Sequence, residues 1–187
     1  KLYDGEVETG LSGQKVSTNW YYNAKVRNTN TGLDNVTTDY SISDSADLFG
    51  LATLVNNNKE LFASKTIYLE ADVDMSQRAW EPIGNATYKF AGTFDGQKTA
   101  SDVIHTISGL WSNQAATNRG LFGYIAEGSW VKDFRLTEST IKQAKGDSGS
   151  VIGCMEGNIQ NGRNYQIDRQ DLQFFMGRSC STASSGR

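Results

Sequence analysis

The amino-acid sequence predicts a mainly β protein whose strands stack as a β-solenoid. Three observations lead to this fold class: short apolar runs, a turn-rich composition and an internal repeat. Between Phe90 and Leu136, apolar runs of strand length alternate with Gly, Asn, Asp and Ser, and none has the length or periodicity of a helix. The chain has 187 residues with 19 Gly and one Pro, yet 37% of it is hydrophobic, which is typical of a folded, turn-rich β protein.

A repeat of roughly thirty residues runs through the second half of the chain. When GLFGYIAEGSWVKDF is aligned with the later GSVIGCMEGNIQNGR, Gly123 falls on Gly153 and Val131 on Ile159, at offsets of 30 and 28 residues. Upstream, Gly92 precedes Gly123 by 31 residues. A period of this length with strands inside it predicts stacked coils, which together bury an apolar face that no single coil can bury.

The stacked coils are expected between about Thr66 and Ile167, without antiparallel hairpins in the range Gly92–Leu136. The apolar positions of the repeat should then form the core. The expected core residues are Ile107, Leu110, Leu121, Phe122, Ile125, Val131, Phe134, Val151 and Ile152.

Several of these motifs resemble a known class of repeat. FAGTFDGQ, HTISGL, GLFGYI, VKDF and GNIQN are similar to the repeats of bacterial surface proteins with GLUG-type motifs, as in adhesin-like and immunoglobulin A protease-associated modules. The resemblance spans about Ser41 to Ile167. It implies a short right-handed parallel β-helix and a bacterial extracellular or cell-surface location. It implies no particular activity, because such modules occur in adhesins, enzymes and surface proteins of other kinds.

Three segments follow from these patterns: an N-terminal β extension over 1–42, a capping helix plus β-helix over 43–167, and a C-terminal tail over 168–187 that packs on or beyond the last coil. In the extension, Val16–Val26 and Val36–Ile42 are rich in β-branched and aromatic residues. We expect one or two strands there, flanking or capping the first coil.

One N-terminal α-helix is expected over Ser43–Asn56. Ser43 is the expected N-cap, and Asp44 and Asp47 in the first turn complement the helix dipole. An amphipathic helix at this place would cover the open end of the first coil and block edge-to-edge strand pairing. Its apolar face comprises Leu48, Leu51, Ala52 and Val55.

Residues Thr66–Met75 alternate between apolar and polar side chains and predict one strand. Glu70, Asp72 and Asp74 would share its outer face. Ca²⁺ takes several oxygen ligands, but side chains at alternate positions of a straight strand spread apart. We therefore expect a solvated strand face, with no metal and no other cofactor.

Catalytic residues are not predicted. The motif GDSGS around Ser148 resembles the nucleophile segment of chymotrypsin-like serine proteases, but the only histidine, His105, lies 43 residues earlier in an expected strand. Asp72, Asp74 and Asp95 are the candidate carboxylates for a polysaccharide lyase or glycoside hydrolase. Whether the protein is an enzyme stays open, and binding is favoured.

Exposed aromatic residues are the candidate binding residues, because Trp and Tyr provide large, rigid contact areas. Trp20, Tyr21 and Tyr22 form one group, which is either a sugar-stacking platform or a set of rings packed on a sheet. Trp111 and Trp130 lie beside expected coil turns. Three readings remain open: a binding or adhesion module for a host or environmental glycan or protein, a carbohydrate-active enzyme, and a structural stalk.

Charge and hydropathy limit the partners. The net charge of −3 and the lack of a Lys/Arg run do not indicate nucleic acid, and no apolar run is long enough for membrane insertion by this fragment. Neighbouring domains of a longer chain are further possible partners. Cys154 and Cys180 are a candidate disulfide that would pin the tail over the last coil in an extracellular protein.

Overall fold

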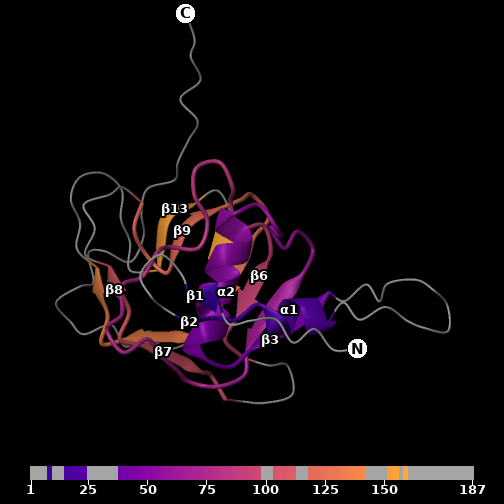
Figure 1. The fold of residues 1–187 in the computed structure, drawn as a ribbon. Helices are drawn as coiled ribbons and strands as arrows, with labels where there is room; N and C mark the ends of the chain where they lie inside the picture. Colours follow the sequence, from indigo (N-terminus) through magenta and orange to yellow (C-terminus); the bar gives the residue numbers. More distant parts are fainter. Residues whose placement is uncertain are drawn as a thin grey trace, which may run out of the picture.

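The computed structural model describes residues 8–9, 15–24, 38–97, 103–112, 118–141, 151–155 and 158–159. Over this part of the chain the protein is mainly β, with two helices and several small parallel sheets (Figure 1). In chain order the elements are β1 (Glu8–Thr9), β2 (Lys15–Val16), α1 (Asn19–Ala24), β3 (Asp39–Ile42), α2 (Ser45–Asn56), β4 (Thr66–Leu69), β5 (Val73–Asp74), β6 (Thr93–Asp95), β7 (Thr106–Ser108), β8 (Trp111–Ser112), β9 (Phe122–Ile125), β10 (Trp130–Lys132), β11 (Arg135–Thr137), β12 (Thr140–Ile141), β13 (Ile152–Met155) and β14 (Asn158–Ile159).

The largest sheet has five strands in the order β14-β10-β6-β4-β3, and all its neighbours are parallel. A second sheet has the order β11-β7-β5, and β12-β8 and β13-β9 are parallel pairs. The chain visits these sheets in the same sequence in each of three passes, which we define as residues 66–90, 93–125 and 130–155. In the first pass, single bridges at Ala79, Ile83 and Phe90 take the place of strands. The expectation that 92–136 would form no antiparallel hairpin is confirmed for the described strands.

The pairing register confirms part of the predicted repeat. Ile152 pairs with Phe122 and Cys154 with Tyr124, so the glycines between them lie opposite each other as the alignment expected. Val131 pairs with Ile159, as expected.

The third correspondence of the repeat, between Gly92 and Gly123, is wrong. The carbonyl of Gly92 accepts a hydrogen bond from the Trp130 N–H, whereas Gly123 donates to the Ile83 carbonyl. The reason is that the passes differ in length. Thr93 pairs with a residue 27 positions earlier, Thr66, and with one 37 positions later, Trp130.

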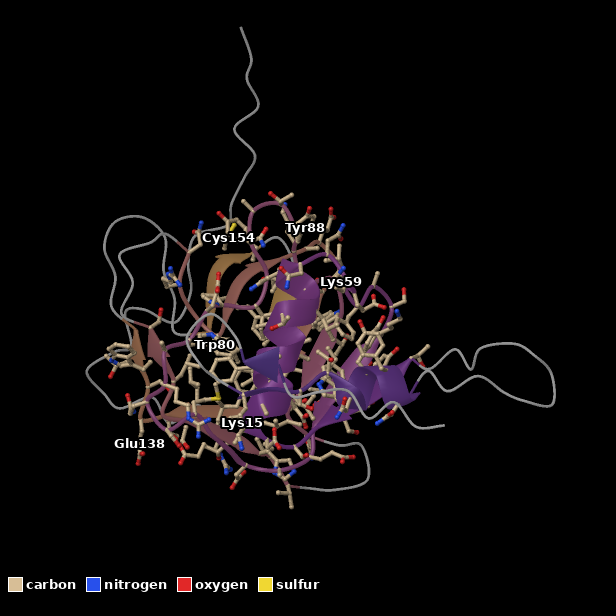
Figure 2. The ribbon with its side chains drawn as sticks, viewed as in Figure 1. Lys15, Lys59, Trp80, Tyr88, Glu138 and Cys154 are labelled. Carbon is tan, nitrogen blue, oxygen red and sulfur yellow. The ribbon has the colours of Figure 1, made fainter. Side chains whose placement is uncertain are left out.

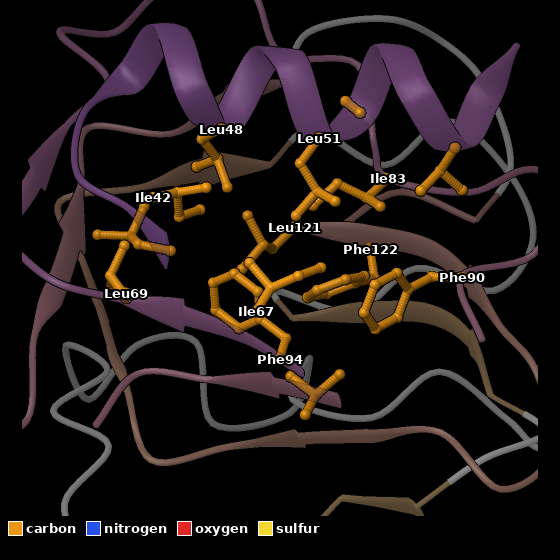
Figure 3. Close-up of a cluster of buried hydrophobic side chains, with 14 of the residues drawn as sticks. Ile42, Leu48, Leu51, Ile67, Leu69, Ile83, Phe90, Phe94, Leu121 and Phe122 are labelled. Carbon is orange, nitrogen blue, oxygen red and sulfur yellow. The ribbon is translucent and has the colours of Figure 1, made fainter. Parts of the chain in front are cut away.

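The interior contains every core residue expected from the sequence, and each of them is at most 2% exposed. Figure 3 shows Leu48 and Leu51 of α2 pointing toward the buried rings of Phe90, Phe94 and Phe122. A column of ring contacts continues through the core across the passes. Its neighbouring pairs are Trp20–Phe62, Phe62–Phe90, Phe90–Phe122, Phe122–Phe94 and Phe94–Phe134, with ring centroids 5.1 to 6.3 Å apart.

Helix α2 begins two residues later than expected, and its N-cap is Asp44 rather than Ser43. The Asp44 side chain accepts a hydrogen bond from the Asp47 N–H at 2.9 Å, and the Asp47 carboxylate accepts from the Ser43 N–H at 3.1 Å. This reciprocal arrangement satisfies helix-start donors from both sides. At the other end, Asn58 has a φ of 54°, which places it in the left-handed conformation expected of a residue that ends a helix.

More of α2 is buried than the predicted single apolar face. Phe49 and Gly50 are also buried: the Phe49 ring packs on Trp80 with centroids 5.3 Å apart, and the segment that follows β2 packs against Gly50. A Cβ atom on Gly50 would lie 1.8 Å from the carbonyl oxygen of Ser17. Helix α2 therefore lies between the core and the N-terminal segment.

Two further expectations are wrong in detail. Residues 16–26 were expected as a strand, but α1 occupies most of the described part. The rings of Trp20 and Tyr21 stack on Phe62 and Tyr40, so tertiary packing overrides the local β preference. Thr66–Met75 is two strands in different sheets, β4 and β5, with a corner between them. The alternation still identifies the inward side chains, since its Ile, Leu, Val and Met residues are all buried.

The expected segments are only partly described. Strand β3, at the end of the predicted N-terminal extension, pairs in parallel with β4 and is an edge of the five-stranded sheet. The predicted tail over 168–187 and the GDSGS motif lie outside the described residues. In the part of the chain that the structure describes, neither helix has the length and apolar character needed to cross a membrane.

The close approach of Gly123 to the preceding pass generates a prediction. Its added Cβ would lie 2.4 Å from the Gly84 carbonyl oxygen, so we expect Gly123→Ala to lower the free energy of unfolding by about 2 kcal/mol. Gly128 has open space, so Gly128→Asn should cost only the strain of its φ of 81°, less than about 1 kcal/mol because Asn adopts this conformation more readily than other residues. Urea denaturation at a constant m-value measures both, and equal losses would contradict the close-packing account.

Candidate binding face on the five-stranded sheet

The outer face of the five-stranded sheet is the candidate functional site. Because successive strand residues point to opposite faces, the inward position of Val131 in β10 places Trp130 and Lys132 on the outside. Pairing extends this alternation across the sheet. One outer row contains Asp39, Thr66, Thr93 and Trp130, and the other contains Ser41, Tyr68, Asp95 and Lys132.

An ion pair occupies the second row. The Lys132 ammonium lies 2.7 Å from Asp95 Oδ2, and the other oxygen of Asp95 accepts a hydrogen bond from the Gln97 N–H at 2.9 Å. Asp95 is only 4% exposed, since it stands between the longer side chains of Tyr68 and Lys132 in the row. From the sequence, Asp95 is a candidate catalytic carboxylate, and its partner Lys132 was not predicted.

The ion pair keeps Lys132 positively charged. Burial by itself lowers the pKa of this ammonium, but the hydrogen bond and charge of Asp95 outweigh burial and raise the pKa above its ordinary value of 10.5. Asp133, whose carboxylate is 3.7 Å from the ammonium, acts in the same direction. Lys132 is therefore a fixed donor with two carboxylates beside it.

Trp130 is the exposed aromatic residue of this face, with 37% of its surface accessible. Its lateral neighbour Thr93 is small, so the ring stands beside a shallow part of the row. Trp111, the other tryptophan expected at a coil turn, is half-buried. It lies in β8, which pairs with β12, so it does not belong to the sheet that contains Trp130.

The three aromatic residues of the N-terminal group all lie in α1, but they point in different directions. Tyr21 is 3% exposed and Trp20 packs on the core, where its Nε1 donates to the Ser17 carbonyl at 3.0 Å. Tyr22 remains exposed. Figure 1 shows α1 beside β3 at one side of the molecule, with β8 at the opposite side.

The Tyr21 hydroxyl belongs to a polar cluster around Glu60. It donates to Glu60 Oε2 at 3.0 Å, the Phe62 N–H donates to Oε1 at 2.9 Å, and the Lys65 ammonium contacts Oε2. Burial alone raises the pKa of Glu60, but these donors lower it below the ordinary value of 4.5. Burial and the Glu60 carboxylate raise the pKa of Tyr21.

The candidate carboxylates of the sequence analysis are engaged separately. Asp72 accepts from the Thr106 N–H at 2.8 Å and lies 3.4 Å from Nδ1 of His105, whereas Asp74 accepts from the backbone and hydroxyl of Ser76. Glu70 is exposed at the corner after β4. Among the described residues, no group of three or more His, Cys, Asp or Glu side chains could hold a metal ion.

Cys154 lies in β13 (Figure 2). It is buried and disulfide-bonded. The chain has two cysteines, and the other, Cys180, lies outside the described residues. The pairing of Cys154 with Cys180 therefore stays a prediction.

Comparison with known proteins gives one distant relative. No protein-family model and no solved structure matches the chain. A protein of Evansella cellulosilytica, named "Putative Gly-rich membrane protein", is 29% identical over 125 residues. That alignment covers 65% of this chain and 14% of the relative, so the chain spans about one seventh of that protein.

The Glu60 cluster predicts a pH-dependent loss of stability. We expect Glu60→Gln to lower the free energy of unfolding by about 2 kcal/mol near neutral pH, because it removes a charged acceptor of several hydrogen bonds. Since the folded state lowers the pKa of Glu60, its contribution is present above pH 4.5 and is lost as the pH falls further. Urea denaturation at several pH values should therefore show that the free energies of unfolding of wild type and variant approach each other as the pH falls below 4.5.

The matched control for this experiment is Glu127→Gln, at an exposed carboxylate on the turn before β10. Its effect should stay below about 0.5 kcal/mol. A constant difference between wild type and Glu60→Gln across the acid range would contradict the role assigned to the charge.

Thiol titration of the unreduced, unfolded chain should detect no free thiol, and a peptide map should join Cys154 to Cys180. On the chain-entropy model, a disulfide that closes a loop of this size stabilises the folded state by about 3 kcal/mol. Reduction should therefore lower the urea concentration at the midpoint of unfolding. Detection of two thiols per chain would exclude the pairing.

Proposed function

We propose that the chain is a binding or adhesion module of a bacterial cell-surface or secreted protein, which recognises a glycan or protein through the outer face of the five-stranded sheet. The observation that carries this proposal is the exposed ring of Trp130 beside the fixed Lys132–Asp95 pair. Exposed aromatic side chains with a positioned polar partner are typical of recognition surfaces.

The proposed architecture is a short right-handed parallel β-helix of the GLUG-repeat kind, with α2 as its N-terminal cap. Parallel pairing of successive passes and the burial of Leu48 and Leu51 of α2 against the core support it. Right-handedness is the expected sense, because nearly all crossovers between parallel strands are right-handed.

Two observations support an extracellular or cell-surface location. Cys154 is disulfide-bonded, and disulfides persist mainly in oxidising compartments. The Evansella relative carries the name of a membrane protein, which agrees with a place in the cell envelope. The carbohydrate-active enzyme has less support, since Asp72 and Asp74 hold backbone groups in separate turns and Asp95 is paired with Lys132.

The proposal is tested by probing a glycan array and a panel of immobilised extracellular proteins with the purified chain. We expect saturable binding to at least one ligand, weakened about tenfold by Trp130→Ala, a loss of about 1.4 kcal/mol. The circular dichroism spectrum and thermal midpoint should be retained, because the ring lies outside the core.

Tyr22→Ala is the comparison variant, since it removes the exposed ring of α1. A loss of binding in this variant alone would place recognition on α1 and contradict the proposed face. Absence of binding to every ligand would favour the structural stalk, and turnover of a polysaccharide would favour the enzyme.

A further inference from the structure

We infer that the face around Trp130 is a subsite for an uncharged polysaccharide, in which one sugar ring stacks on the indole and a sugar hydroxyl accepts a hydrogen bond from Lys132. This inference rests on the proposed function and specifies the ligand class. Asp95 is a positioning residue for Lys132, because it is too buried to present its carboxylate to a ligand.

The first element is the stacking surface. Trp130 projects outward from a central strand of the sheet, with β6 on one side and β14 on the other. A sugar ring presents a face of C–H groups, and the indole is the largest rigid apolar surface among the side chains. The small neighbour Thr93 leaves room beside the ring and supplies a hydroxyl in the same row.

The second element is a donor at a fixed place. Lys132 follows Trp130 by two residues on the same face, so their Cα atoms are about 7 Å apart. The contact with Asp95 at 2.7 Å holds the ammonium and reduces the entropy that binding would otherwise cost. The Lys132 side chain is still 28% exposed, so it can donate to a hydroxyl beside the stacked ring.

The third element is the local charge. Lys132 has carboxylates of both Asp95 and Asp133 beside it, at 2.7 and 3.7 Å. A polyanionic chain would gain little from an ammonium that is already compensated and would meet two negative groups. The charge pattern therefore favours an uncharged sugar over uronate-rich, sulfated or nucleic-acid chains.

The limited apolar area favours a sugar over a protein. Among the described residues, the exposed large hydrophobic side chains are Tyr22, Val103 and Trp130. Tyr22 belongs to α1, so Trp130 is the exposed ring of this sheet face, and Tyr68 in the other outer row is half-buried. Stable protein interfaces bury about 800 Å² per partner around clustered apolar anchors, whereas one exposed ring among hydroxyl and charged side chains suits a sugar.

The test is native electrophoresis of the purified chain in gels that contain soluble polysaccharides. The neutral probes are laminarin, xyloglucan, galactomannan, arabinoxylan and dextran, and the anionic probes are polygalacturonate, alginate and heparin. We expect retardation by at least one neutral polysaccharide, and retention of that effect at about 0.5 M NaCl, where exposed charges are screened.

Two substitutions at one position separate stacking from bulk. Trp130→Phe keeps an aromatic face and should retain affinity within about fivefold, whereas Trp130→Leu keeps apolar bulk without a ring and should lose about tenfold or more. Thermal denaturation checks that both variants fold. Equal affinities of the two variants would overturn the stacking role.

The remaining outcomes also decide the inference. Retardation by polyanions alone, abolished by salt, would overturn the uncharged-ligand assignment. Binding to an immobilised protein without retardation by any polysaccharide would overturn this inference while the proposed binding function stands. Absence of all binding would overturn both.

Discussion

Parallel pairing in register is the constraint on which the remaining structure depends. Because the strands of successive passes align residue by residue, Ile67, Phe94 and Val131 form one inward row, and Thr66, Thr93 and Trp130 form the adjacent outward row. A slip of one residue in β10 would turn Val131 outward and Trp130 inward. Exposing one buried apolar side chain to water costs about 2 kcal/mol. The core therefore fixes the strand register, and the register fixes which side chains form the binding face.

Sequence patterns predicted the features that depend on local alternation or on nearly constant spacing. The expected core positions are buried, and the glycines of the aligned repeat lie opposite each other in β9 and β13. Helix α2 was predicted because its cap residues and apolar spacing lie within one short segment. The identity of its N-cap was missed by one residue, since Ser43 and Asp44 are both good cap residues and only the backbone shows which one begins the helix.

Features that depend on distant contacts could not be predicted in the same way. Helix α1 exists where aromatic residues favoured a strand, because Trp20 and Tyr21 find stacking partners in the segments around Phe62 and Tyr40. The Lys132–Asp95 pair joins residues 37 positions apart in the sequence. In the neighbouring strand pairs β4–β6 and β10–β14, paired residues are only 27 or 28 positions apart. The acidic and basic residues were visible at the ends of TFD and WVK, but only the register shows that they are neighbours.

The unequal passes also bear on protein engineering. Thr66, Thr93 and Trp130 remain aligned in one row, although the chain takes ten residues more to pass from Thr93 to Trp130 than from Thr66 to Thr93. Additional chain is thus accommodated between strands, while the pairing that builds the sheet is unchanged. Because loop closure entropy grows slowly with length, such crossings are suitable places to graft a foreign peptide without rebuilding the scaffold.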